Sequence, residues 1–317
     1  MSIRWIRHDV ITSCTQRASE RRFFFKPTAA IRELIGVSAA RAQKRFPVKL
    51  YWLEVNVNHL HYGIAPIDDT PDAVTYYVRF RQLFNRLVAE GVNHLWGRRG
   101  AVFGAPASEV HCLDNESVHE CFYYAITNPV KDGLCDRVAE WEGFSSYPYL
   151  AQGKVAEFCY IDRAAWHRAG GERNKVSIEE FEETETLVFT PLPGTEELSE
   201  SERRSRIIAE VCVRESRFRS QRRKEGRLAM DKNARARIDP LSAPRKLTCD
   251  TPRPLCHTVS SAAYQKYEEE AKQFGQEYGA ASHQYLRGNF YTAFPLGSIR
   301  PPLIRSAVSD SNERRAA

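Results

Sequence analysis

The chain is 317 residues long, 42% of its residues are hydrophobic, and its formal net charge is +6. This length suits one large domain or two ordinary ones, and the apolar fraction excludes a mainly disordered protein. No run of about 18 apolar residues is present, so we expect no membrane span, and the Arg-rich N-terminus argues against a signal peptide. We therefore expect a cytoplasmic protein.

The cysteines also favour a reducing compartment. Eight are scattered through the chain without a Cys-x-x-Cys pair, which argues against a zinc ribbon and a dense disulfide framework. Cys249 is near Cys256 and His257, but this spacing matches no standard zinc motif. We interpret the cysteines as ordinary thiols.

Positive charge is concentrated in two segments. Residues 1–50 hold 11 Lys and Arg against 3 Asp and Glu, and residues 203–246 hold 15 against 5. Residues 172–202 between them contain ten glutamates. Two basic clusters favour contact with a polyanion, and a phosphate backbone is the usual partner. Solvated helix faces are the equally weighted alternative.

Strands and a helix alternate in the first part of the chain. Weak alternation predicts a strand at residues 6–12, and an apolar cluster predicts a second at residues 21–25. Near-helical spacing of apolar residues predicts a helix over residues 28–43. Residues 48–55 and 59–64 read as two strands around an Asn-containing turn, which predicts a β-hairpin.

Two helices follow the hairpin. Aromatic and aliphatic residues share one side of residues 72–95, which predicts an amphipathic helix. A second helix at residues 115–127 is ended by Asn128-Pro129, because proline disfavours helix in the residue before it. The order strand, strand, helix, hairpin, helix, helix predicts an α+β fold whose helices pack on one face of the sheet.

The character of the chain changes after residue 150. A capping box at residues 199–202 opens a long basic helix over residues 200–227, and four prolines mark residues 239–254 as a linker. Over residues 264–285, aromatic and small residues recur in steps of three and four, which predicts a helical seam. We expect this seam to pack against the preceding helix or a second chain.

Asn58-His59-Leu60-His61-Tyr62 is the stretch most informative about function. Successive strand side chains point to opposite faces, so His59 and His61 share one face while Leu60 and Tyr62 share the other. Two imidazoles on one face offer two nitrogen ligands to one metal ion. The motif alone is a weak signal, because a site also needs a third ligand and a reacting group.

The helix predicted at residues 115–127 supplies candidates for both. Tyr124 and Asn128 are four residues apart, which makes them neighbours on successive turns. Asn128 would be the third ligand and Tyr124 the nucleophile. A buried tyrosine beside a helix-capping asparagine is the alternative, and spacing alone favours it. Tyr123 is the rival nucleophile, but it lies about 100° around the helix and has Thr127, not an amide, one turn on.

These motifs together resemble the single-tyrosine HUH transposases, and among them the REP-associated tyrosine transposases. The matching segments occur in the same order and cover roughly residues 5–150. They are Thr12-Ser13, Gln16-Arg17, Arg22-Phe23, Asn58-His59-Leu60-His61, Gly97-Arg98-Arg99-Gly100, Tyr124 with Asn128-Pro129-Val130-Lys131-Asp132-Gly133-Leu134, and Trp141-Glu142-Gly143-Phe144-Ser145-Ser146-Tyr147. Val57 and Phe103 stand where the family commonly has Pro and Trp; neither is a predicted ligand or nucleophile.

The resemblance implies a ferredoxin-like antiparallel sheet with helices on one face. Residues 1–150 would form an HUH nuclease domain. Residues 151–317 would form a helical, partly basic C-terminal region of unknown role.

The resemblance also implies a specific chemistry. His59, His61 and Asn128 would hold Mg²⁺ or Mn²⁺, which would polarise the scissile phosphate. Tyr124 would attack phosphorus, leaving a 5′-phosphotyrosine and a free 3′-hydroxyl. The covalent link would keep the phosphodiester energy, so the enzyme would cleave and rejoin DNA without ATP.

The implied partner is single-stranded or hairpin DNA, with association with the nucleoid as a consequence, and a homodimer is left open. Basic residues around the site would bind the DNA. They are Arg7, Arg17, Arg21, Arg22, Arg98 and Arg99. Two alternatives are a transposase-derived hairpin-binding protein without strand transfer and a metal phosphodiesterase that uses activated water.

Overall fold

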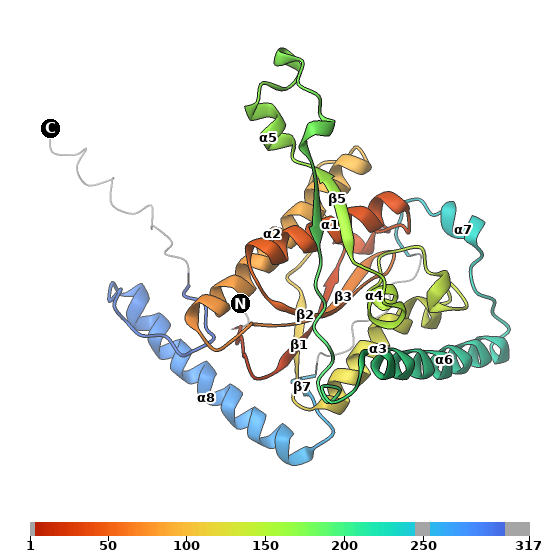
Figure 1. Ribbon diagram of the computed structural model, residues 1–317. Coiled ribbons are helices and arrows are strands. Elements are labelled where there is room, and N and C mark those ends of the chain that lie inside the picture. Colours follow the sequence, from red (N-terminus) through yellow and green to blue (C-terminus); the bar gives the residue numbers. More distant parts are fainter. Residues whose placement is uncertain (1–3, 245–253, 302–317) are drawn as a thin grey trace. The chain divides into compact units, whose positions relative to one another are not determined.

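The computed structural model describes residues 4–244 and 254–301. Its largest sheet is five-stranded and mixed, in the order β2-β3-β1-β4-β7 (Figure 1). The first four pair antiparallel, and β7 runs parallel to β4. The strands are β1 (Ile11–Arg17), β2 (Lys49–Val55), β3 (His59–Ala65), β4 (Ser108–Cys112) and β7 (Cys256–His257). The chain is an α+β protein, as predicted.

Three long helices flank the sheet: α1 (Ala29–Arg45), α2 (Pro71–Leu95) and α3 (Asn115–Lys131). α1 and α2 pack against each other, and the ring of Tyr62 in β3 lies 6.3 Å from that of Phe84 in α2. Strand alternation puts Tyr62 on the same side as Leu60 and Ile64. We call this side the α2 face.

α3 covers the opposite side of the sheet. The ring of Trp52 in β2 lies 6.1 Å from that of Phe122 in α3. Trp52 pairs with Gly63, which alternation puts on the side of His59 and His61. We call this side the α3 face. The prediction of helices on one face alone is therefore wrong, because the short strand β4, which the sequence analysis missed, intervenes before α3.

Side-chain caps begin the helices that carry and support the site. The Thr70 hydroxyl accepts a hydrogen bond from the Ala73 amide at 3.2 Å at the start of α2. An Asp114 carboxylate oxygen accepts one from the Ser117 amide at 2.7 Å at the start of α3. Such caps satisfy amides that have no partner within the helix.

α3 continues past its predicted end at Asn128 and includes Pro129. Proline has no N–H, so one backbone hydrogen bond of the helix is lost. Packing offsets this loss: Pro129 and Val130 are both buried, and Arg222 donates a hydrogen bond to the Val130 carbonyl. Asn128 consequently lies inside a helix instead of capping its end.

The first two predicted strands are also corrected. β1 begins at Ile11, not at residue 6, and its pairing with β3 sets Thr15 opposite His61. The apolar run at residues 21–25 forms no strand; it follows a short 3-10 helix, and its Phe25 is fully buried. An apolar cluster indicates burial, but it does not specify strand pairing.

Residues beyond α3 add a two-stranded sheet, β5–β6, and further helices. Their bounds are α4 (Tyr147–Gln152), β5 (Glu157–Ile161), α5 (Arg163–Arg168), β6 (Glu182–Thr186), α6 (Glu200–Lys224), α7 (Lys232–Ala236) and α8 (Ser261–Leu286), with 3-10 helices at Val138–Glu140, Gly171–Asn174 and Glu179–Phe181. The short 3-10 helix that follows β1 is Ser19–Arg21. The predicted basic helix is α6, and its capping box is present.

α6 packs on α3 and α4. Its buried Glu215 accepts a hydrogen bond from the Val138 amide at 2.6 Å, and its buried Arg222 pairs with Asp136 at 2.6 Å. Some charged residues of α6 therefore hold the helix against the rest of the protein, and only the remainder of the basic segment is a solvated face.

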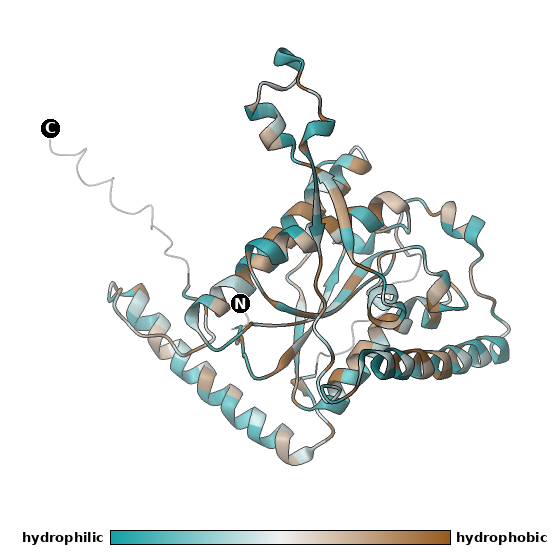
Figure 2. Cartoon of the chain, in the orientation of Figure 1, coloured by the Kyte–Doolittle hydropathy of each residue, from teal (hydrophilic) through white to brown (hydrophobic). Residues whose placement is uncertain are grey.

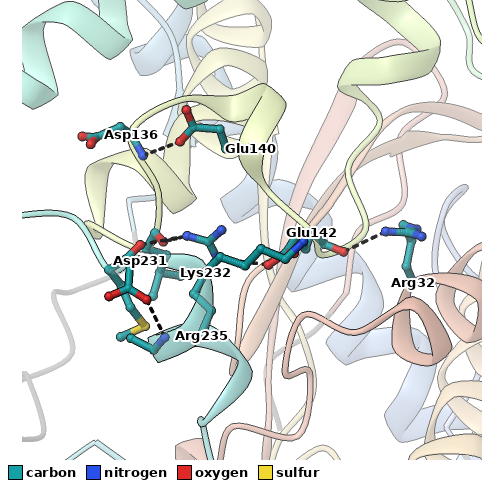
Figure 3. Close-up of polar contacts among 10 residues, drawn as sticks. Arg32, Asp136, Glu140, Glu142, Asp231, Lys232 and Arg235 are labelled. Atoms are coloured by element: carbon teal, nitrogen blue, oxygen red, sulfur yellow. Dashed lines mark hydrogen bonds and ion pairs between the residues drawn. The ribbon is translucent and has the colours of Figure 1, made fainter.

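The segment after α6 is fastened to the loop that follows α3 (Figure 3). The Glu142 carboxylate pairs with Lys232 at 3.1 Å and with Arg235 at 3.3 Å. Arg235 also donates to the Leu134 carbonyl at 2.9 Å, and Arg32 of α1 donates to the Glu142 carbonyl at 3.2 Å. These contacts connect α7, the loop and α1.

The contacts divide the chain elsewhere than at residue 150. Arg7–Ala263 forms one compact unit, and the described residues of Met1–Ile6 and Tyr264–Ala317 form a second. The first unit extends past residue 150 because α6 packs on α3. Cys249 and most of the predicted linker lie outside the described residues.

The aromatic seam packs within the second unit, where we expected the preceding helix or a second chain. The Trp5 ring stacks on Tyr267 and Phe274 of α8, with centroids 5.8 and 4.9 Å away. Figure 2 shows α8 mostly in the hydrophilic colour. Within residues 4–244 and 254–301, no helix has the length and apolarity needed to cross a bilayer.

Candidate functional site

The two histidines of β3 lie side by side on the α3 face. Their ring centroids are 4.8 Å apart, and the ring planes are perpendicular. His61 is 7% exposed, and its Nδ1 is 2.9 Å from the Thr15 hydroxyl on β1. His59 is half-buried, and its Nδ1 is 2.7 Å from the Asn58 amide oxygen. The neighbouring strand and the turn thus fix the orientation of both rings.

The surroundings keep both imidazoles neutral. Burial lowers the pKa of His59 to about 4 and holds the pKa of His61 well below its usual range. The positive charge of Arg17 lowers both pKa values further, whereas a hydrogen bond with Asn128 partly opposes the shift at His59. A neutral imidazole is the form that binds a metal ion.

Tyr124 of α3 lies directly beside this pair. Its ring is 5.7 Å from the His61 ring, edge to face, and 40% of the residue is exposed. The Lys131 ammonium lies 4.4 Å from the centroid of the same phenol ring. The tyrosine is therefore both accessible from outside and held between an imidazole and a cation.

Tyr123, the rival nucleophile, faces away from the histidines. It is 5% exposed, and its ring packs 4.9 Å from that of Phe122 and 5.2 Å below the Arg214 guanidinium of α6. The side chain is thus part of the packing between α3 and α6. Of the two tyrosines, Tyr124 is the one whose ring contacts a histidine of β3.

Asn128 is 2% exposed and lies on the turn of α3 that follows Tyr124. Its side chain forms a hydrogen bond with His59, and its amide oxygen accepts one from Asn56 at 2.5 Å. Asn56 also donates to Asp132 at 2.9 Å. The amide is therefore oriented by the turn of the β2–β3 hairpin.

This set of groups fits a metal ion held by mixed nitrogen and oxygen ligands. The Nε2 atom of His61 is buried and has no hydrogen-bond partner among the described residues. A buried polar atom left without a partner is costly, and a bound cation would remove that cost. The fit depends on the Asn128 amide, since no group of three or more His, Cys, Asp and Glu side chains in the described part of the chain could hold a metal.

Two of the six predicted DNA-binding arginines lie at the site. Arg17 pairs in register with His59, and the charges of Arg17 and Arg21 both act on that ring. Arg22 instead bonds to Glu20 at 2.8 Å and to the Leu241 carbonyl at 2.7 Å.

The other three arginines make local contacts or are exposed. Arg98 lies 4.1 Å over the Phe24 ring and donates to Asn93. Arg7 pairs with Asp9 at 2.9 Å, and Arg99 is exposed on its loop. The contacts of Arg7 and Arg98 hold local structure, so only part of the predicted set surrounds the histidines.

The sequence analysis missed three residues that position or contact the site. Thr15 contacts His61, Asn56 donates a hydrogen bond to Asn128, and Lys131 lies against the Tyr124 ring. The sequence alone does not indicate a contact between Thr15 and His61, because this contact depends on the pairing of β1 with β3. Lys131 falls two turns after Tyr124 only if the helix passes Pro129, which the local rule argues against.

Glu120, one turn before Tyr124 on α3, is held by a contact with α6. Its carboxylate accepts a hydrogen bond from Arg214 of α6 at 3.0 Å. This bond and the adjacent charge lower the pKa of Glu120. The residue therefore helps to hold α6 on α3.

No protein-family model matches the chain, and no curated protein matches it. Among solved structures, a REP-associated tyrosine transposase bound to a REP hairpin is similar to it, with 15% sequence identity and a TM-score of 0.36. The similarity covers 47% of this chain and 82% of the other. This similarity is distant, so the function has to be argued from the residues of this chain.

Proposed function

We propose that the protein is a metal-dependent, single-tyrosine DNA transposase or endonuclease that nicks and rejoins single-stranded or hairpin DNA. One observation carries the proposal: the accessible Tyr124 ring lies 5.7 Å from His61, whose Nε2 is buried without a partner. A nucleophile and a ligand-ready imidazole thus meet at one place on the α3 face.

His59, His61 and the Asn128 amide oxygen would hold the metal, Mg²⁺ or Mn²⁺. When bound, the ion would polarise the scissile phosphate and offset the negative charge that develops on its oxygens. Imidazole nitrogen is a ligand that suits transition metals, whereas Mg²⁺ prefers oxygen and gives up its water reluctantly. The two histidines therefore favour Mn²⁺ over Mg²⁺.

Tyr124 would perform the covalent step. Its phenol oxygen gives up its proton and bonds to phosphorus as the bond from phosphorus to the 3′ oxygen breaks, and the 3′ oxygen takes up that proton, by way of solvent, to leave as a hydroxyl. Lys131 beside the ring, with Arg17 and Arg21 near His59, places positive charge around the reacting phosphate. A 3′-hydroxyl attacking the phosphotyrosine reverses the step and releases Tyr124.

The topology supports the finer assignment to a ferredoxin-like HUH domain. β1, α1, β2, β3, α2 and β4 follow one another along the chain, which is the β-α-β-β-α-β order of that fold. The paired order β2-β3-β1-β4 places the histidine strand in the interior of the sheet. α3 follows this βαββαβ unit in the chain and packs on the face of the sheet that carries the two histidines.

The test is a covalent-adduct assay. Because the target sequence is unknown, the full-length protein is incubated with a pool of hairpin oligonucleotides with randomised flanks and Mn²⁺, then run on a denaturing gel. We expect an adduct that depends on Mn²⁺ and disappears in His59→Ala, which still binds the pool. Cleavage without an adduct would identify a water-activating phosphodiesterase and contradict the proposal.

A transposase-derived DNA-binding protein without strand transfer is the second candidate, favoured by the arginines near His59. It predicts salt-dependent binding of hairpins with no adduct in any divalent metal. That outcome would reject the enzyme and retain the DNA-binding surface.

A further inference from the structure

A second group of reactive side chains lies beside the candidate site. Cys112 ends β4 and is buried, and Cys121 lies in α3 and is half-buried. Their sulfur atoms are 3.6 Å apart, and the Cys112 thiol donates a hydrogen bond to Cys121. The two residues are nine apart in the chain, so the β4–α3 connection alone brings them together.

His257 completes this group from β7. It pairs in register with Cys112, and its side chain forms a hydrogen bond with Cys121. The hydrogen bond from Cys112, followed by the contact with His257, lowers the pKa of the Cys121 thiol. The pKa of His257 is raised by the same contact. This arrangement favours a thiolate on Cys121 and a proton on His257.

We propose that Cys112 and Cys121 are a peroxide-reactive thiol pair that closes into an intramolecular disulfide. A disulfide has sulfur atoms about 2.05 Å apart, so the sulfurs have to approach by roughly 1.5 Å. Side-chain rotation at the end of β4 and on the first half of α3 can supply such a movement. We do not interpret these side chains as a metal site, because the described residues contain no group of three or more His, Cys, Asp and Glu side chains that could hold a metal ion.

The reaction balances with a hydroperoxide as oxidant. The Cys121 thiolate attacks a peroxide oxygen, the O–O bond breaks, and the departing oxygen takes a proton from His257 to leave as water or an alcohol. The sulfenic acid formed on Cys121 is then attacked by the Cys112 sulfur. The second step forms the S–S bond and releases water, with the Cys112 proton and the sulfenic hydroxyl as its source.

The pair is joined to the candidate site through two elements. On β1, Ser13 forms a hydrogen bond with Cys121. Thr15, two residues further along the same strand, forms a hydrogen bond with His61. On α3, Tyr124 follows Cys121 by three residues, about one turn. A disulfide would therefore tie the helix that carries Tyr124 to strand β4.

Peptide mapping tests the proposal on the full-length protein. The reduced protein is treated with dilute hydrogen peroxide, alkylated, and digested with trypsin, which leaves both cysteines in the peptide of residues 100–131. We expect this peptide to lose two hydrogen atoms in mass and to take no alkyl group. The exposed Cys159 and Cys212 serve as internal controls and remain alkylated.

Variants separate the two roles. In Cys112→Ser, Cys121 should stop at a sulfenic acid that dimedone captures, whereas Cys121→Ser should leave Cys112 reduced. A thiol that is mostly thiolate at pH 7 should react on the order of tenfold faster than an ordinary one, and His257→Gln should remove part of that advantage. If the wild-type peptide takes two alkyl groups at a peroxide concentration that oxidises Cys212, the proposal is wrong.

Discussion

The two faces of the sheet use the same strand for opposite purposes. On the α2 face, Leu60 and Tyr62 are at most 1% exposed. A buried ion pair there is satisfied: Arg81 donates to the Tyr62 hydroxyl at 3.1 Å and to Glu109 at 2.7 Å. On the α3 face, His61 keeps a nitrogen without a partner among the described residues.

This difference follows from the two-residue period of β3. The residues that seal the core alternate with the residues that face α3, so the hydrophobic half of the strand fixes the positions of the histidines. On the α2 face Arg81 is paired with Tyr62 and Glu109, whereas on the α3 face the buried His61 Nε2 has no partner among the described residues and lies beside an accessible tyrosine. We therefore expect substitutions on the α2 face to lower stability and substitutions on the α3 face to remove activity.

The largest effect is expected from Tyr124→Phe. Removing the phenol oxygen should reduce the DNA adduct to background, because that oxygen would form the ester with DNA. The free energy of unfolding should change little, since 40% of the residue is exposed. Tyr123→Phe is the matched control and should keep the adduct; loss of the adduct in both variants would contradict the assignment.

A large difference in stability is expected between neighbouring residues of β3. Leu60→Ala removes a fully buried side chain from the α2 face and should lower the free energy of unfolding by about 2–5 kcal/mol. His61→Ala removes a ring whose Nε2 is already unsatisfied, so it should cost much less. Urea denaturation compares the two. An equal loss would mean that His61 is an ordinary core residue.

The acid sensitivity of the metal-free protein should come partly from the α3 face. The pKa of His59 is about 4 in the folded chain and about 6.5 in the unfolded one, so the unfolded state binds more protons between these values. The stability from the neutral ring is complete above pH 6.5 and is lost as the pH falls toward 4. This loss is up to about 3 kcal/mol. His59→Gln should flatten the pH dependence measured by denaturation, and an unchanged slope would count against a buried neutral His59.

Metal should stabilise the α3 face in a way that depends on the ligands. At about 100 times its dissociation constant, Mn²⁺ should raise the free energy of unfolding by about 2.7 kcal/mol. Mg²⁺ at the same concentration should give a smaller rise in Tm, because two of the ligands are imidazoles. His59→Ala should abolish the Mn²⁺ shift, whereas a shift that survives in His59→Ala and His61→Ala would place the ion elsewhere.

The sequence predicted the parts of the molecule that depend on local patterns. The β2–β3 hairpin, α2 and the shared face of His59 and His61 follow from alternation and helical spacing over short windows. Tyr124 and Asn128 could be linked because residues four apart meet on any helix. These contacts need no knowledge of how distant segments pair.

The parts that failed depend on tertiary contacts. Pro129 is a local signal for a helix end, but burial and the bond from Arg222 carry α3 past it. β4 is five residues long and begins with two polar residues, so its local sequence does not indicate a strand. It becomes recognisable through its pairing with β1. Glu215 and Arg222 look like solvated charges in sequence, although both are buried where α6 meets its neighbours.

The most direct measurement is to locate the covalent bond to DNA on the chain. The adduct formed with Mn²⁺ is digested with nuclease and trypsin, and the peptide of residues 100–131 is sequenced by mass spectrometry. The proposed site predicts a nucleotide esterified to Tyr124, and none when His59 is replaced. A nucleotide on Tyr123 or in another peptide would contradict the site, and the absence of any adduct across the hairpin pool would contradict the enzyme.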